Sequence, residues 1–458
     1  MKKILYLTLV FTLLFSFVST YNVSALDSKY ETVKVGIYYS SSAKDNLTVS
    51  SDNGFQAGYM DGSAFVSLYE LLENNLDVSY FSSSGIVING TIYNISKDNL
   101  ALMPNNGIVN INGTLYRGGV EFIANSSSKL TVINFVNIND YIAAVVGKEM
   151  SPSWPIEALK AQAVCARSYF ISVWNKHSSQ GFNMCNLQDC QTYLGISGES
   201  QSTIRAAMET KDQILTYNGS VASTVYSSSN GGSSAYSKYV WGGDLPYLQA
   251  VKDIYEDQEE ASYTPWQVTL TNSEIQNKLS SKGINIGSVY DIEVTGADEY
   301  GRTYEVTIYG TSGTHVLKND STRSFFGLRS QKYTILTKND KPVSSSPSDT
   351  DAVYSISSSG SFVVSDYNIL SSSGVSASKN TLFALGKNGK QSFNPITTST
   401  PPALSVDTSK IEEGSYLFNG TGWGHGVGMS QWGAKAMADR GFDYKDILNF
   451  YFNGTTLQ

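Results

Sequence analysis

The sequence has few of the residues from which disulfide frameworks and histidine-rich metal centres are built. It holds three cysteines and three histidines among 458 residues. An odd number of cysteines leaves at least one thiol unpaired, so a closed disulfide framework is excluded. Cys165, which lies among Ala163, Val164 and Ala166, is predicted to be a small buried helix residue. The chain also lacks a phosphate-binding loop, a nucleotide fingerprint and a Gly-x-Ser-x-Gly elbow with matched partners, so nucleotide binding and serine hydrolase chemistry are not indicated.

Charged residues are scarce as well, and positive ones are in the minority. They make up 16% of the chain, with 32 Lys and Arg against 40 Asp and Glu, for a formal net charge of -8. An acidic surface argues against nucleic-acid binding, which depends on basic patches. It argues equally against electrostatic adhesion to anionic lipids or polymers. We therefore expect no nucleic-acid partner, and any polymeric ligand would have to be bound in a shaped groove.

The N-terminus has the pattern of a signal peptide. Lys2 and Lys3 precede an uncharged, mostly apolar run over 4–18, and Val23-Ser24-Ala25 offers the small residues that a signal peptidase recognises. The run is shorter than the roughly 20 residues that cross a bilayer. We predict cleavage after Ala25, which removes two lysines and changes the net charge from -8 to -10. The alternative is an uncleaved membrane anchor, and either way the bulk of the chain is expected outside the cytoplasm.

Aromatic and small polar residues are abundant and indicate a strand-rich protein. The chain has 30 Tyr and 19 Phe, and Asn-Gly pairs suited to tight hairpins recur, for example at 89–90 and 112–113. We predict an α+β fold, rich in strands with a few helices, in which a central domain carries β-rich accessory regions and a small insertion. The predicted divisions are a signal peptide at 1–25, a β-rich region at 26–128, a central core at 129–340, a Ser-, Thr- and Pro-containing insertion at 341–412, and a C-terminal Gly-His-Gly segment at 413–458 that packs on the core.

Helices are expected at four places. The clearest has Pro155 as its first residue and runs to about Trp174. Its apolar residues recur about every 3.5 positions, which predicts one buried stripe. The stripe comprises Ile156, Leu159, Ala163, Phe170 and Val173. The other helices are expected at 203–210, 273–280 and 430–440, the last of them stopped by Gly441.

Glu149 is the first candidate for chemistry. It lies between an apolar run at 141–146 and a Pro-containing turn, where a carboxyl would be partly desolvated and its pKa raised toward a value useful for proton donation. Lys160 and Arg167 follow on the predicted helix. Their separation of seven residues puts them on one face, where two cations can grip carboxylate or carbonyl groups of a ligand. The alternative is that Glu149 is a helix cap or dipole partner.

A second candidate is a metal site formed by His177, Cys185 and Cys190, whose side chains are of the types that bind Zn²⁺. Asp189 is the nearest spare carboxylate that could serve as a fourth ligand. The alternative is a disulfide between Cys185 and Cys190, which an oxidising exterior permits. The residues alone leave both interpretations open.

Two further segments are rich in glycine and small polar residues. Tyr226 ends a predicted hairpin strand and leads into a Ser-Ser-Ser-Asn-Gly-Gly loop, which can present hydroxyl and amide groups to a sugar or can be an ordinary surface turn. Glycine at every second position from 422 to 428 allows close backbone approach. Within and after this segment, His425 and Gln431 are candidate polar groups of a groove. For His425 a hydrogen-bonded structural role is predicted rather than metal binding.

These segments belong to a longer series with a characteristic order. The series is Tyr116-Arg-Gly118, Asn139-Asp-Tyr-Ile142, the stretch from Val146 to Tyr169, Cys190-Gln-Thr-Tyr-Leu-Gly195, the 226–232 loop, Trp241-Gly-Gly, Pro246-Tyr-Leu248, Gly327-Leu-Arg-Ser330, and Gly422-Trp-Gly-His-Gly-Val-Gly-Met-Ser-Gln-Trp-Gly-Ala434. It resembles the stage II sporulation protein D and amidase enhancer family. The resemblance covers most of 31–340 and 415–458, whereas 341–410 falls outside it.

The resemblance implies a lytic transglycosylase that acts on peptidoglycan glycan, particularly on strands already stripped of stem peptides. The family's catalytic glutamate maps onto Glu149. Its substrate-binding residues map onto Lys160, Arg167, Tyr226, Ser229 and Asn230. The implied reaction cleaves the bond between N-acetylmuramic acid and N-acetylglucosamine and leaves 1,6-anhydro ends. The setting would be sporulation or vegetative remodelling of the cell wall, by a protein secreted to the wall or held at the membrane.

The resemblance also implies a structural zinc ion near Cys185 and Cys190, with His177 as a third ligand, and no other cofactor. Several relatives have a histidine directly before the second cysteine, where this chain has Asp189. A different class of function stays open: a non-catalytic wall protein that binds glycan strands and activates a partner amidase. A zinc amidase is disfavoured, because it would need a ligand set richer in histidine and glutamate.

Overall fold

The computed structural model describes residues 26–83, 85–94, 99–125, 127–256, 265–340 and 406–458, and the backbone of six short strands between 353 and 393. The predicted signal peptide at 1–25 and most of the predicted insertion at 341–412 therefore lie outside the described residues. Over the part of the chain that is described, no helix has both the length and the apolar character that a membrane crossing requires.

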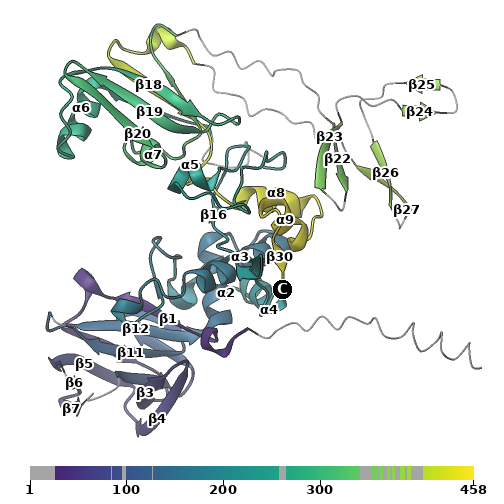
Figure 1. Ribbon diagram of the computed structural model, residues 1–458. Helices are drawn as coiled ribbons and strands as arrows, with labels where there is room; N and C mark the ends of the chain where they lie inside the picture. The colour runs from purple at the N-terminus through teal and green to yellow at the C-terminus, as the bar shows by residue number, and fades with distance from the viewer. Residues whose placement is uncertain are drawn as a thin grey trace, which may run out of the picture.

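The N-terminal part consists of two sheets with a shared core (Figure 1). The larger sheet has the strand order β13-β1-β12-β11-β8-β3-β4, and the smaller has the order β10-β9-β2-β5-β6-β7. The larger sheet contains β1 (Thr32–Tyr38), β3 (Phe55–Asp61), β4 (Ala64–Leu71), β8 (Leu100–Pro104), β11 (Gly119–Ala124), β12 (Leu130–Asn137) and β13 (Met184–Cys185). The smaller contains β2 (Asn46–Ser50), β5 (Asn75–Ser82), β6 (Gly85–Ile88), β7 (Thr91–Asn94), β9 (Ile108–Ile111) and β10 (Thr114–Arg117).

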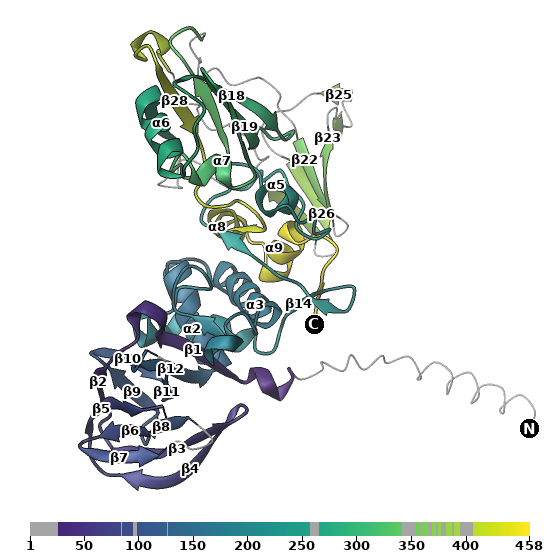
Figure 2. The ribbon, with the colours of Figure 1, turned by 60° about the vertical axis from the view of Figure 1, so that its left-hand side comes forward.

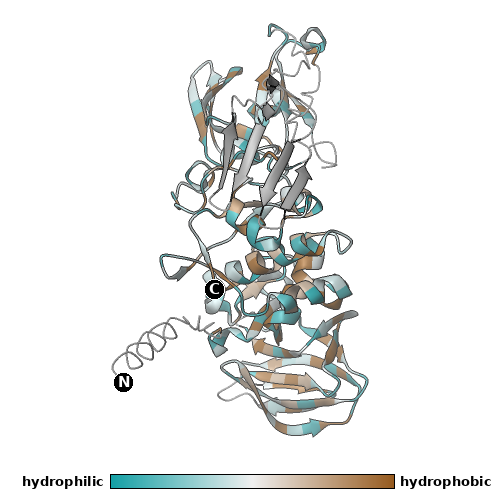
Figure 3. Cartoon of the chain, turned by 90° about the vertical axis from the view of Figure 1, so that its right-hand side faces the viewer, coloured by the Kyte–Doolittle hydropathy of each residue, from teal (hydrophilic) through white to brown (hydrophobic). Residues whose placement is uncertain are grey.

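Alternation of apolar and polar residues places these strands with one face in the core. In β2 the side chains of Leu47 and Val49 are buried while their neighbours are exposed, and Figure 3 shows the same alternation along other strands. The predicted Asn-Gly turns are confirmed: Asn89 and Gly90 both have positive φ, as a tight hairpin turn requires. The predicted boundary at 128/129 is corrected, because it separates β11 from β12, which pair along their whole length.

A layer of helices lies on this β-rich part (Figure 2). It is formed by α2 (Ile138–Glu149), α3 (Ile156–Ser172) and α4 (Gln201–Glu209), onto which α8 (Gln431–Asp439) and α9 (Tyr444–Tyr451) pack from the C-terminus. The predicted helices at 155–174, 203–210 and 430–440 are confirmed with small shifts, and Pro155 is the residue before the first helical position. The predicted stripe on α3 was too narrow: α2, α4, α8 and α9 all contact α3, which is buried on nearly all sides.

Residues 265–340 form a second β-rich unit with a hydrophobic core of its own. One sheet pairs β17 (Trp266–Thr271) and β21 (Tyr333–Leu336) with β28 (Ser415–Gly420), and the other contains β18 (Val289–Ala297), β19 (Thr303–Gly310) and β20 (Gly313–Lys318). Helix α6 (Asn272–Ser281) confirms the helix predicted at 273–280. We call residues 265–340 together with β28 the upper unit. The region predicted as one core at 129–340 thus comprises a helical layer and most of this upper unit.

The C-terminal segment, predicted to pack on the core, joins the two units. After β28 in the upper sheet, β29 (Met429–Ser430) pairs with β16 (Tyr226–Ser227), and β30 (Thr456–Leu457) pairs with β14 (Leu215–Tyr217), which forms a hairpin with β15 (Ser220–Val221). The small β insertion predicted at 351–390 contains three hairpins. Their strands are β22 (Val353–Ser357), β23 (Gly360–Val364), β24 (Ile369–Ser371), β25 (Gly374–Ser376), β26 (Leu382–Gly386) and β27 (Gly389–Phe393). The fold is α+β and strand-rich, as predicted.

Candidate active site

A cavity of about 670 Å³ lies where the helical layer meets the loops of the upper unit. Glu149, at the end of α2, and the 188–192 loop contribute one side of it. The 225–228 strand, the end of α5 (Ser237–Trp241) and the glycine-rich segment contribute the other. About half of the lining residues are neutral and polar. They are Tyr169, Gln188, Gln191, Thr192, Tyr226, Ser227, Ser228 and Gln431. Such a lining suits a ligand that carries many hydroxyl and amide groups.

Glu149 is the last residue of α2, a helix that the sequence did not predict. The carboxyl is held there by two long hydrogen bonds: the Thr192 N–H lies 3.4 Å from Oε1, and Nε2 of Gln431 lies 3.4 Å from Oε2. Burial raises the pKa of Glu149, and the two donors offset this shift only in part. The partial negative charge at the C-terminus of a helix acts in the same direction as burial. The alternative that Glu149 caps a helix start is not what the structure shows.

Tyr226 lines the same cavity, and a chain of hydrogen bonds holds its hydroxyl in place. Tyr141 donates its hydroxyl to Oε1 of Gln191 at 3.1 Å, and Nε2 of Gln191 donates to the Tyr226 hydroxyl at 2.9 Å. Burial, together with the nearby Glu149 carboxylate, raises the pKa of Tyr226 well above its ordinary value. Because its oxygen accepts from Gln191, the Tyr226 hydroxyl hydrogen is available to a ligand or to Glu149.

The glycine-rich segment passes close to the backbone of the 225–229 region. A β-carbon on Gly428 would lie 2.1 Å from the Val225 carbonyl oxygen, and Gly428 has positive φ, so only glycine fits. Within the segment, the half-buried imidazole of His425 accepts the Val427 N–H on Nδ1 at 3.0 Å, and desolvation lowers the pKa of His425 to about 4. The predicted structural histidine is confirmed, and both His425 and Gln431 line the cavity.

Lys160 and Arg167 share one face of α3, as predicted, but this face packs on α4 and not on the cavity. The Lys160 ammonium pairs with Glu157 at 2.9 Å and with Glu209 at 2.6 Å. Arg167 is fully buried and donates to the carbonyl oxygens of Ala207 at 3.0 Å and Thr210 at 2.7 Å. Arg167 therefore binds carbonyl groups, as expected, but they are backbone carbonyls at the end of α4 and not those of a ligand.

Ser229 and Asn230 are also placed away from the cavity surface. Both are fully buried. The Ser229 hydroxyl and the Asn230 N–H donate to the Glu256 carboxylate, and the Asn230 side-chain amide donates to Asp253 at 2.7 Å. These contacts fix the loop that follows Tyr226. Of the predicted substrate-binding residues, the structure brings Tyr226 to Glu149 and leaves Lys160, Arg167, Ser229 and Asn230 in the interior.

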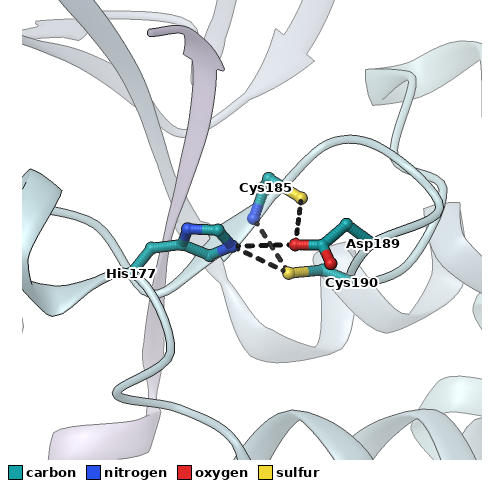
Figure 4. Close-up of side chains that lie close together, drawn as sticks. All are labelled: His177, Cys185, Asp189 and Cys190. Atoms are coloured by element: carbon teal, nitrogen blue, oxygen red, sulfur yellow. Dashed lines mark hydrogen bonds and ion pairs between the residues drawn. The ribbon is translucent and has the colours of Figure 1, made fainter. Parts of the chain in front are cut away.

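The predicted metal ligands do converge. His177, Cys185, Asp189 and Cys190 place one ligand atom each within 4.8 Å of one another (Figure 4). Nε2 of His177 lies 3.2 Å from Sγ of Cys190 and 3.5 Å from Oδ2 of Asp189, and Sγ of Cys185 lies 3.9 Å from the same oxygen. Both thiols are free, without a disulfide between them. The adjacent Cys190 lowers the pKa of Cys185 to about 5.

This geometry fits a tetrahedral zinc ion. With zinc–ligand bonds of about 2.0–2.3 Å, tetrahedral ligand atoms lie roughly 3.3–3.8 Å apart, close to the separations found here. Two sulfurs, one imidazole nitrogen and one carboxylate oxygen are a suitable donor set. With four protein ligands no position is left for a substrate, which is the pattern of structural and not catalytic zinc. Such an ion would fix the loop whose next residues, Gln191 and Thr192, contact Tyr226 and Glu149.

Several cavity residues were not predicted as site residues. Thr192, Trp241, Arg323 and Trp423 line the cavity. Trp241 and Trp423 belong to motifs that carry the family resemblance, and this could have marked them as site residues. Nothing near them in the sequence indicates that they line the same cavity as Glu149. Thr192 acts on Glu149 through its backbone N–H, which leaves no trace in residue type, and also through its side chain.

Comparison with known proteins gives a consistent assignment for this fold and site. Residues 126–217, which include Glu149 and the four candidate metal ligands, match the family model described as Stage II sporulation protein. The chain is 33% identical over 318 residues to the Amidase enhancer of Bacillus subtilis (strain 168), covering 69% of this chain and 40% of that protein. It is 25% identical over 339 residues to Stage II sporulation protein D of the same organism, covering 70% and 74%. An uncharacterised protein of Brachyspira hyodysenteriae is 28% identical over 351 residues, covering 76% and 73%.

The protein is thus an α+β protein with a largely buried carboxyl in a polar cavity. The match at 126–217 and the named relatives make the chain similar to the stage II sporulation protein D family. The chain spans about two fifths of the length of the Amidase enhancer that it matches.

Proposed function

We propose that the protein is a lytic transglycosylase of peptidoglycan, active on glycan strands from which the stem peptides have been removed. The observation that carries the proposal is the placement of Glu149: a carboxyl with a raised pKa, in a cavity where about half of the lining residues are neutral and polar. The names of the relatives, which refer to sporulation and to an amidase, support a role in the cell wall. The predicted signal peptide supports action outside the cytoplasm.

The proposed reaction needs one carboxyl group. Protonated Glu149 gives its proton to the glycosidic oxygen between N-acetylmuramic acid and N-acetylglucosamine, and the bond from that oxygen to C1 breaks. Ionised Glu149 then takes the proton of the muramic 6-hydroxyl, whose oxygen bonds to C1 and closes a 1,6-anhydro ring. The substrate supplies the nucleophile, so the second carboxylate of ordinary glycosidases is not required. A raised pKa keeps Glu149 protonated for the first step.

The neighbours of Glu149 suit the second step. The Thr192 N–H and the Gln431 amide donate to the two carboxylate oxygens and favour the ionised form that follows proton transfer. Tyr226, which stays protonated, offers a hydroxyl beside the same group. Asp189, the other carboxylate in the lining, is exposed and pairs with Lys176 at 3.1 Å, so it is not equivalent to Glu149.

Product analysis tests this proposal. Purified peptidoglycan, with and without prior amidase digestion, is incubated with the protein and with Glu149→Ala, and the soluble products are identified by mass spectrometry. Anhydro-muramic ends from the unaltered protein alone, preferentially after amidase digestion, are expected. The same products from both proteins would assign the chemistry to another residue. Circular dichroism of both proteins controls for folding.

A second candidate function is a glycan-binding activator of a cell-wall amidase, favoured by the name of the relative that is 33% identical. It predicts no anhydro products from either protein, with glycan binding retained. It also predicts that an amidase releases more stem peptides when the protein is added.

We further propose that His177, Cys185, Asp189 and Cys190 hold a structural zinc ion. The observation that supports this is the convergence of four suitable donor atoms within 4.8 Å, on a loop that contacts Glu149. The ion would order this loop and take no part in bond cleavage.

A further inference from the structure

Two tryptophan side chains are exposed in the same cavity as Glu149. Trp241 is 49% exposed and Trp423 is 40% exposed, and both contribute to the cavity lining. Large aromatic side chains gain much free energy from burial, and an exposed pair in a concave polar site indicates a surface that a ligand covers. Neither residue has a part in the proton transfers proposed above.

Both rings are held in place from behind. Trp241 packs against the half-buried imidazole of His425, with ring centroids 5.1 Å apart. The backbone of Trp423 exchanges two hydrogen bonds with Ser229, of 2.9 and 3.1 Å, and the Arg329 guanidinium lies 4.9 Å from the Trp423 ring centroid. Each indole is thus positioned by well-packed groups before any ligand arrives, which reduces the entropy lost on binding.

The chemistry of the lining limits what can lie on these rings. Arg323, a cation in the lining, is paired with Asp320 at 2.8 Å, and Asp189 is paired with Lys176. The lining of the same cavity includes the amide and hydroxyls of Gln188, Ser227 and Ser228. A pyranose ring with equatorial substituents matches this combination, because its two faces carry C–H groups that pack on an aromatic face while its edge carries hydroxyl and amide groups.

We propose that Trp241 and Trp423 form an aromatic subsite on which N-acetylhexosamine rings of the glycan strand stack, so that the scissile bond is held at Glu149. The subsite rests on the proposed function for the identity of the strand. It is a binding element, separate from the carboxyl that would transfer protons.

The test measures binding in a protein that cannot turn the strand over. In a Glu149→Gln background, the affinity for soluble glycan strands freed of peptides is measured by calorimetry and by the change in tryptophan fluorescence. We expect Trp241→Ala and Trp423→Ala each to weaken binding by about fivefold to tenfold, the size of an aromatic contact. Trp241→Tyr should retain most of the affinity, since it keeps an aromatic face. Tyr290→Ala, which removes a ring that is 60% exposed outside the cavity, should change nothing.

Kinetics separate this inference from the function on which it rests. In the otherwise unaltered protein, Trp241→Ala and Trp423→Ala should raise KM with little change in kcat, because the stacked ring contacts ground state and transition state alike. Unchanged affinity in both alanine variants would overturn the subsite, even if anhydro products still depended on Glu149. If the alanine variants bind glycan more weakly, but the protein with Glu149 intact forms no anhydro products, the subsite is supported and the transglycosylase is overturned.

Discussion

Nε2 of Gln431 lies 3.4 Å from Oε2 of Glu149, although the two residues are 282 positions apart in the sequence. Glu149 ends α2 in the helical layer, whereas Gln431 begins α8, directly after the glycine-rich segment that leaves the upper unit. The Ser430 hydroxyl caps α8 by accepting the Gly433 N–H and donates to the buried Glu256. The first half of the chain therefore places the Glu149 carboxyl, and the C-terminal segment supplies one of its hydrogen-bond donors.

This contact predicts how the pH dependence of catalysis can be shifted. The amide of Gln431 favours ionised Glu149 and so lowers the pKa of Glu149, against the larger effect of burial. A general acid works only while it is protonated, so kcat/KM should fall as the pH rises through that pKa. Replacing Gln431 by Met removes the donor, and the midpoint of this descending limb should move to higher pH. Anhydro-product formation from amidase-treated glycan, measured at a series of pH values, gives the midpoint.

Gln188→Met is the matched control for this shift. Gln188 lines the same cavity but is not among the described residues that donate a hydrogen bond to Glu149, so its loss should leave the midpoint where it is. If the midpoint of Gln431→Met moved to lower pH, the descending limb would belong to a group other than Glu149.

Zinc content provides a prediction for the cluster beside the cavity. The protein purified without chelator should carry a single bound zinc ion, and Cys185→Ser or Cys190→Ser should lose it, since each removes one of four ligands. The melting temperature should fall when zinc is removed by a chelator and recover when zinc is restored, because the ion binds the native chain only. Elemental analysis and calorimetry measure the two quantities.

Cys165→Ala is the control for these cysteine variants. Cys165 is fully buried in α3, outside the cluster, so this variant should keep its zinc even if it is less stable. A protein without zinc, in which a thiol assay after denaturation counts only Cys165, would instead establish the disulfide between Cys185 and Cys190.

The sequence predicted the parts of the site that depend on residue type and local pattern, and missed those that depend on packing. Glu149, Tyr226, His425 and Gln431 could be singled out, and the structure brings them to one cavity. The same-face placement of Lys160 and Arg167 followed from helical periodicity, but periodicity does not say what covers a face.

Two failures have separate physical causes. Helix α2 was not predicted because its apolar run contains β-branched residues and is too short for periodicity to distinguish a helix from a buried strand. Ser229 and Asn230 were expected to bind a ligand because the family's substrate-binding residues map onto them. Here they are the partners that two buried carboxylates, Glu256 and Asp253, require.

A substitution at Arg167, the fully buried cation of α3, tests whether its role is structural or substrate-binding. Its guanidinium satisfies carbonyl oxygens at the end of α4, and Arg167→Met would leave these acceptors buried and unpaired. We expect a loss of unfolding free energy on the order of 3 kcal/mol. The glycan affinity of the folded protein should be unchanged. Urea unfolding and calorimetric titration measure the two effects, and a large loss of affinity at unchanged stability would restore the substrate-binding role.

The buried acid Glu256 predicts a second pH effect, on stability instead of catalysis. Burial and the nearby charge of Asp253 raise the pKa of Glu256, so the native chain holds this proton at pH values where the unfolded chain has released it. The contribution of Glu256 to stability is therefore largest below its unfolded pKa and declines as the pH rises toward the folded value. In Glu256→Gln the group cannot ionise, but an NH2 donor replaces one of the two oxygens that accept from Ser229, Asn230 and Ser430. The variant should thus be less stable at low pH, and its deficit relative to the unaltered protein should shrink as the pH rises. Urea unfolding at matched pH values measures that deficit, and a deficit that grows with pH would mean that Glu256 is ionised and stabilised by its donors throughout.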